Sequence, residues 1–264
     1  MKSKKSDPAS KLHHLTNLCP EERLHIQGSI SCGLPSEYLP WPYGMPSSAD
    51  PYVVIIGASP GNSPEPSEKN IGSSEGWSYG PPTFGQAHAG FFYRDSKGYW
   101  DKVRSLCGGI IKAESPSLSE SDAIAVSGHL NLGVGRSGSA AADGVVDARL
   151  ISWISSLLGS VLSPKVVVCF GLNGILTKAQ NNAAWKSAPG ALAVDWRNPH
   201  CKIDFHGYAF RIWEATRNDG ELVLLCMWPN HPSRHPFAGT ADGGLWCEAV
   251  AEFCEVIKCR GHIY

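Results

Sequence analysis

The sequence lacks the marks of several large protein classes. Its net charge is -1 over 264 residues, so nucleic-acid binding depends on a local basic patch rather than on an overall basic excess. No apolar run approaches the roughly 18 residues of a membrane span. No apolar segment follows the basic residues 1–5, so we expect no secretory signal. The composition, with 42% hydrophobic and 18% charged residues, is typical of a globular domain.

Common metal and cofactor patterns are also missing. The nine cysteines include no Cys-x-x-Cys pair, the ten histidines form no His-Glu-x-x-His pattern, and there is no Walker motif. Several cysteines lie in apolar runs, such as residues 168–170 and 225–227, where a thiol acts as a small hydrophobic group. We therefore expect reduced, buried cysteines in a cytoplasmic protein, and neither a metal nor an organic cofactor.

Apolar strands alternate with amphipathic helices along much of the chain. The strand candidates are residues 52–56, 123–127, 165–170 and 222–227, and helical periodicity recurs in residues 99–107, 146–158 and 245–257. This alternation predicts an α/β fold with three α/β/α layers and a central, mainly parallel four-stranded sheet. The turn signal at residues 217–220 allows a hairpin between residues 208–213 and the last strand.

The chain divides into two parts by composition. Residues 1–50 are polar and punctuated by proline, and we expect a lead-in segment that is partly disordered. Residues 51–264 contain all the strand and helix candidates and are expected to form one domain.

Two polar loops follow apolar strands that are far apart in the sequence. Residues 57–62 (Gly-Ala-Ser-Pro-Gly-Asn) follow the first strand, and residues 230–233 (Asn-His-Pro-Ser) follow the last. Ligands of open parallel sheets bind beyond the carboxyl ends of the strands. The two loops are therefore expected to face one site.

The first loop also satisfies the Gly-x-Ser-x-Gly pattern of serine hydrolases. In such sites the backbone N–H after the serine helps to stabilise an oxyanion, but Pro60 follows Ser59 and has no N–H. A serine hydrolase that uses Ser59 is therefore the weaker alternative. A Gly-x-Gly-x-x-Gly match at residues 133–138 has no acidic residue about 20 positions later and favours a plain glycine loop over a dinucleotide site.

Taken together, the two loops resemble motifs of the uracil-DNA glycosylase superfamily, most closely its mismatch-specific branch. Residues 57–62 are similar to the first motif, Gly-x-Asn-Pro-Gly, and residues 230–233 to the second, His-Pro-Ser. Three segments between them agree in order. Residues 99–103 resemble the aromatic-Trp helix, residues 129–136 the segment with a base-reading Asn and a later Arg, and residues 166–171 the third strand with its glycine. The resemblance covers roughly residues 50–258.

This resemblance implies a site for cleaving the bond between a flipped base and its deoxyribose. His231 would stabilise the anionic leaving base, and the Asn131 amide would match a uracil-type edge. A phenylalanine among Phe84, Phe91 and Phe92 would stack on the base. The implied catalytic residues are His231, Ser59 and Asn62; the substrate-binding residues are Asn131, Gly57, Ala58, Pro60, Gly61, Phe84, Phe92 and Ser233; the DNA-binding residues are Arg136, Arg234, His235 and Phe237.

Within the DNA-binding set, Phe237 and the preceding Pro236 suit a wedge in the base stack, and Arg234 suits a phosphate contact. Ser59 departs from the family pattern, because relatives carry a water-activating Asp or Asn at that position. A neutral serine is a poor general base, although Asn62 offers a second group for positioning water. The four-cysteine spacing of branches with an iron–sulfur cluster is absent, so no cluster is expected.

Two functions follow from this resemblance. The first is hydrolysis of a damaged or deaminated base from single- or double-stranded DNA by a monomeric protein, placed in the nucleoid or nucleus if it acts in repair. The second is a relative that has lost catalysis and binds nucleic acid or a modified nucleotide.

Overall fold

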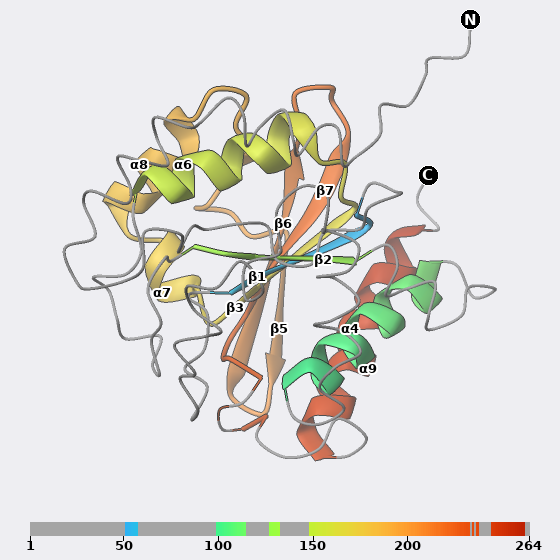
Figure 1. The fold of residues 1–264 in the computed structure, drawn as a ribbon. Helices are drawn as coiled ribbons and strands as arrows, with labels where there is room; N and C mark the ends of the chain where they lie inside the picture. The colour runs from blue at the N-terminus through green and yellow to red at the C-terminus, as the bar shows by residue number, and fades with distance from the viewer. Residues whose placement is uncertain are drawn as a thin grey trace, which may run out of the picture.

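The computed structural model describes residues 51–57, 99–114, 127–132, 148–232, 234, 236–237 and 244–261. Within them, seven strands form one sheet in the order β2-β1-β3-β7-β6-β4, and β5 pairs with β6 (Figure 1). The strands are β1 (Val53–Gly57), β2 (Ser127–Asn131), β3 (Val166–Phe170), β4 (Ala193–Val194), β5 (Cys201–Phe205), β6 (Tyr208–Thr216) and β7 (Leu222–Trp228). The helices are α4 (Tyr99–Glu114), α6 (Ala148–Ser156), the π-helical η3 (Leu157–Val161), α7 (Asn173–Leu176), α8 (Ala179–Ser187) and α9 (Gly244–Gly261). The expected lead-in, residues 1–50, lies outside the described residues.

Four neighbouring strands, β2, β1, β3 and β7, run parallel. β1 and β3 are buried along their whole length, which explains their continuous runs of valine and isoleucine. The connection from β1 to β2 and the connection from β2 to β3 cross the sheet in opposite directions. Right-handed crossovers then place α4 and α6 on opposite faces. The prediction of a mixed α/β fold with a mostly parallel sheet is confirmed.

Alternate residues of β1 enter two different hydrophobic clusters. Val53 and Ile55 pack in a cluster that includes buried residues of α4 and α9. Val54 and Ile56 pack in a second cluster with buried residues of α6, η3 and α8. Figure 1 shows α4 beside α9 and α6 beside α8, with the strands between the two pairs. The period of two in a strand therefore sends successive side chains to different helices.

The expected number of four strands is too small. The described sheet has seven, because β6, β5 and β4 extend it beyond β7 as antiparallel strands. In β5, buried residues alternate with exposed ones, so no continuous apolar run marks the strand. A two-residue turn joins β5 to β6, with a φ of 50° at His206 and 79° at Gly207. Two residues with positive φ are the requirement of a type I′ hairpin.

Two element boundaries differ from those predicted. The second predicted strand, residues 123–127, shares only Ser127 with β2, and residues 123–126 lie outside the described residues. The second helical pattern, residues 146–158, is too short, because η3 includes Gly159 and continues to Val161. Gly159 is needed there because a Cβ on it would lie 2.2 Å from the Gly190 oxygen. The hairpin of residues 208–213 with the last strand is confirmed as β6 and β7.

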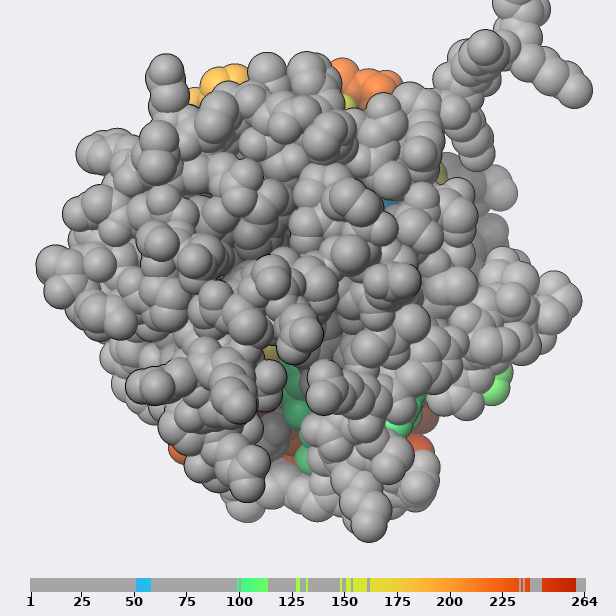
Figure 2. All heavy atoms as spheres, in the orientation of Figure 1, coloured from blue at the N-terminus to red at the C-terminus, as the bar shows by residue number. Residues whose placement is uncertain are grey.

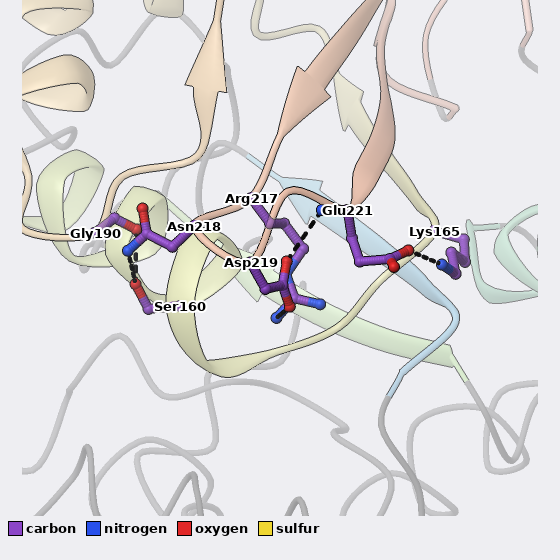
Figure 3. A network of polar contacts seen from close by, with 7 residues as sticks. All are labelled: Ser160, Lys165, Gly190, Arg217, Asn218, Asp219 and Glu221. Carbon is purple, nitrogen blue, oxygen red and sulfur yellow. Dashed lines mark hydrogen bonds and ion pairs between the residues drawn. The ribbon is translucent and has the colours of Figure 1, made fainter.

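The edge of the sheet where β7 begins is tied together by polar contacts (Figure 3). The Ser160 hydroxyl donates to the Gly190 carbonyl at 2.8 Å and accepts from the Asn218 amide at 3.0 Å. In the same turn, Arg217 pairs with Asp219 at 3.1 Å. We call this end of β7 the amino edge.

Cysteines in the described residues do not all follow the expected burial. The seven among them are free thiols. Cys107, Cys169, Cys226 and Cys254 are buried, and burial raises the pKa of each. Cys201 is half-buried, whereas Cys247 and Cys259, both in α9, are exposed. No helix in the described ranges is both long and apolar enough to cross a membrane.

Candidate functional site

After the adjacent parallel strands β1 and β3, the chain continues into helices that belong to two different hydrophobic clusters. After β1 the next described element is α4, whose buried residues belong to the cluster of Val53. After β3 the chain enters α7 and α8, whose buried residues belong to the cluster of Val54. Such a topological switch point, beyond the carboxyl ends of the strands, is where open α/β sheets bind ligands. The topology therefore places a candidate site beyond the ends of β1 and β3.

We call the edge of the sheet where the parallel strands end the carboxyl edge. The segment of residues 229–237, here called the His231 loop, follows β7 at this edge. Gly171, just after β3, has a φ of +64°, and a Cβ on it would lie 3.4 Å from the His231 nitrogen. The Gly171 N–H donates to the Trp228 carbonyl at 3.0 Å. A glycine with positive φ thus lets the end of β3 approach the His231 backbone closely.

Aromatic rings hold the His231 side chain. Its imidazole stacks on the Tyr99 ring with centroids 4.9 Å apart and an interplanar angle of 8°. The Phe170 ring meets it edge-on at 6.5 Å. Burial, followed by the positive charges of Arg234 and Lys102, lowers the pKa of His231 to about 4. At neutral pH the imidazole is therefore uncharged and lies in a region of positive potential, which favours an anion nearby.

A buried ammonium lies behind the His231 loop. Lys102 of α4 is 2% exposed, and its Nζ donates to the Pro232 carbonyl at 2.7 Å and to the Phe237 carbonyl. The same Nζ lies 5.9 Å from the centroid of the Trp246 ring, within the range of a cation–π contact. Burial lowers the pKa of Lys102. Helix α4 therefore contacts the loop twice, through Tyr99 and Lys102.

Two of the predicted site residues are brought side by side at the carboxyl edge. Gly57 ends β1, Asn131 ends β2, and the two are register partners in the sheet. Asn131 lies beyond the predicted strand of residues 123–127, but it is the last residue of β2. His231 is at the same edge beyond β7, with β3 between β7 and β1. Other predicted residues lie outside the described ones: Ala58, Ser59, Pro60, Gly61, Asn62, Phe84, Phe91, Phe92, Arg136, Ser233 and His235.

The two remaining predicted DNA-binding residues differ in exposure. Arg234 is exposed, as a phosphate contact requires, and its N–H donates to the His231 carbonyl at 2.9 Å. Phe237 is only 1% exposed and packs against the rings of Trp228 and Trp246. Its burial contradicts the expected role as a wedge, because a wedge must leave the protein surface. The Phe237 side chain instead packs in the hydrophobic cluster that includes buried residues of α9.

Sequence reasoning missed the roles of Tyr99 and Lys102. Both lie in residues 99–107, where the sequence predicts a helix that resembles an aromatic-Trp helix, but neither pattern indicates a role for these two side chains. Their spacing of three residues places them on one face of α4. That spacing was visible in the sequence, but the burial of a lysine was not. In the space-filling view, atoms of α4 (green) reach the surface below the centre, whereas the turn between β6 and β7 (orange) lies at the top edge (Figure 2).

No protein-family model, curated protein or solved structure matches this chain. Within the described ranges, no group of three or more His, Cys, Asp or Glu residues is arranged to hold a metal ion. The residues at the carboxyl edge and their chemistry are therefore the basis for a proposed function.

Proposed function

We propose that this protein is a DNA glycosylase-like hydrolase that cleaves the N-glycosidic bond of a flipped damaged or deaminated base. The observation that carries the proposal is His231, an uncharged imidazole held after β7 between aromatic rings and two cationic side chains. We also infer a three-layer α/β/α domain, because α4 with α9 and α6 with α8 belong to two different clusters of the sheet.

The electrostatics near His231 suit a leaving group that becomes negative. Cleavage produces an anionic base and an oxocarbenium-like sugar, so a catalyst must stabilise negative charge on the base. A neutral imidazole donates one N–H to such an oxyanion. The charges of Arg234 and Lys102, which lower the pKa of His231, favour the same anion. Since the imidazole stays neutral above about pH 5, it needs no protonation at neutral pH.

The strand ends supply candidate groups for the base itself. In the proposed site the Asn131 amide matches the edge of a uracil-type base, because an amide offers both a donor and an acceptor. The loop after Gly57 carries Ser59 and Asn62, which are proposed to orient the attacking water. The exposed Arg234 is proposed to contact a DNA phosphate.

The decisive experiment is single-turnover cleavage of oligonucleotides that contain uracil, hypoxanthine, xanthine or an alkylated base, in single and double strands. Alkaline scission detects the abasic product. We expect His231→Ala to slow base release by about 10²–10³-fold, as for the loss of one oxyanion donor. His200→Ala is the matched control, because His200 is exposed and lies against Glu214 on β6. An inactive wild-type protein, or equal rates for both variants, would overturn the proposal.

DNA binding separates the enzyme from a catalytically impaired relative. Each phosphate contact adds about 0.9 to the negative slope of log affinity against log salt. We expect Arg234→Ala to reduce the slope by about one unit. The control Lys165→Met should leave it unchanged, because Lys165 pairs with Glu221 at the amino edge, at the other end of the sheet. Salt-dependent binding without an abasic product indicates the non-catalytic relative. Covalent labelling of Ser59 by a fluorophosphonate indicates the serine hydrolase instead.

A further inference from the structure

In the chemistry proposed above, the ammonium of Lys102 contributes only its positive charge, yet its contacts are with the His231 loop and with Trp246 of α9. It donates to the carbonyls of Pro232 and Phe237, on either side of Arg234. Burying a cation without a compensating partner is expensive, so such groups persist where hydrogen bonds hold them. Among the described residues, the hydrogen-bond partners of Lys102 are these two neutral carbonyls.

The loop itself has the form of two successive turns. The Arg234 N–H donates to the His231 carbonyl at 2.9 Å, and the Phe237 N–H donates to the Arg234 carbonyl at 2.8 Å. Lys102 donates to one carbonyl in each turn: that of Pro232, inside the first turn, and that of Phe237, at the end of the second. Tyr99, on the same face of α4, stacks on the imidazole at the start of the loop. One helix face therefore holds the loop at three points.

We propose that Lys102 is a positioning residue, which fixes the His231 loop on α4 so that the imidazole stays at the carboxyl edge of the sheet. Its action on His231 runs through the Pro232 carbonyl, one residue beyond the imidazole. The catalytic consequence rests on the proposed glycosylase activity, but the placement of the loop does not. A misplacement of about 1 Å is enough to slow a reaction by about 10²-fold. Loss of the Lys102 hydrogen bonds should therefore slow base release.

The test compares three variants of the full chain. Lys102→Met keeps the length of the side chain and removes charge and donors; Lys102→Gln keeps donors on a shorter, uncharged side chain. Ile110→Ala is the control, because Ile110 is buried on the same helix, away from the loop contacts described for Lys102. The measurements are the His231 pKa by NMR, the exchange rates of the Arg234 and Phe237 amides, and the single-turnover rate.

For Lys102→Met we expect the His231 pKa to rise by about one unit, since a nearby cation is lost and the loop is released to water. The two amides should exchange faster, and base release should slow by about 10²-fold. Lys102→Gln should slow base release less than Lys102→Met does. Ile110→Ala should lower stability yet leave the His231 pKa and the amide exchange unchanged.

A folded Lys102→Met variant with wild-type His231 pKa and amide exchange would overturn the proposal, as would an Ile110→Ala variant that shifts them equally. If Lys102→Met does not fold, Lys102→Gln carries the same comparison. The NMR and exchange measurements need no substrate. If the wild-type protein has no glycosylase activity, the proposed function is wrong, but the role of Lys102 in positioning the loop can still be tested.

Discussion

The two edges of the sheet hold their charged groups in opposite ways. At the amino edge the charges form ion pairs: the largely buried Arg217 side chain pairs with the half-exposed Asp219, and Lys165 pairs with Glu221 near the surface (Figure 3). At the carboxyl edge, Lys102 is buried against neutral carbonyls and the neighbouring His231 has a depressed pKa. Exposed ion pairs contribute little net stability, whereas a perturbed pKa beside a buried charge is typical of a functional site. The contrast indicates that charges at the amino edge stabilise a turn, and it is the reason that the proposed chemistry is assigned to the carboxyl edge.

If steric fit rather than charge holds the amino edge, the largest effect there should come from a glycine. A Cβ on Gly159 would meet backbone atoms of Gly190, Ala191 and Leu192 at 2.2–2.5 Å, and backbone has little room to yield. We expect Gly159→Ala to lower the free energy of unfolding by about 3 kcal/mol, measured by urea denaturation. In the control Gly174→Ala, the new Cβ meets nothing within 4 Å. This helical position should gain up to about 1 kcal/mol.

A small effect of Gly159→Ala would show that the loop of residues 188–192 moves freely away from η3. The amino edge would then be the looser of the two edges, against the comparison drawn above. A large loss in both glycine variants would point instead to a general sensitivity of the domain to substitution.

Because of His231, we expect the carboxyl edge to make the stability of the protein depend on pH. Burial and nearby cations lower the pKa of His231 to about 4 in the folded protein, against about 6.5 in the unfolded chain. Between these values the unfolded chain binds more protons, so this contribution is fully present above pH 6.5 and is lost as the pH falls toward 4. From pH 7 to pH 5 the loss is about 2 kcal/mol.

The measurement is urea unfolding of the wild type and of His231→Gln at pH 7, 6 and 5. The wild type should lose more stability than the variant, and the difference should grow as the pH falls. His200→Gln is the control, because His200 is exposed near Glu214. Parallel pH profiles for the wild type and His231→Gln would contradict the buried, neutral imidazole.

The fold was predictable where a strand is apolar throughout. β1, β3 and β7 are buried for most of their length, so hydrophobic runs mark them. β2 has the sequence Ser-Gly-His-Leu-Asn, and its place in the sheet comes from pairing with β1. β5 alternates exposed and buried residues, so its period of two and the following His-Gly turn were the available signals.

For the candidate site, the sequence predicted only those residues that lie at the ends of recognisable strands. His231 and Asn131 follow from that rule, since both lie at the carboxyl edge. Phe237 misled because an aromatic residue near a loop suits both a wedge and a core, and only packing against Trp228 and Trp246 decides. Lys102 was missed because a lysine on an amphipathic helix is normally exposed. Its carbonyl partners lie 130 or more positions away in the sequence.

The smallest predicted effect lies in the ion pair of the amino edge. The Lys165 Nζ lies 2.8 Å from Glu221 Oε2, with side chains 49% and 59% exposed. Water screens such a pair, so a double-mutant cycle of Lys165→Met and Glu221→Gln should give a coupling below about 1 kcal/mol. The coupling should shrink further in 1 M salt, where the Debye length is about 3 Å. A coupling well above that value, unchanged by salt, would mean that the amino edge also depends on a strong charge interaction. The contrast between the two edges would then lie in how deeply the charges are buried, and no longer in how strongly they interact.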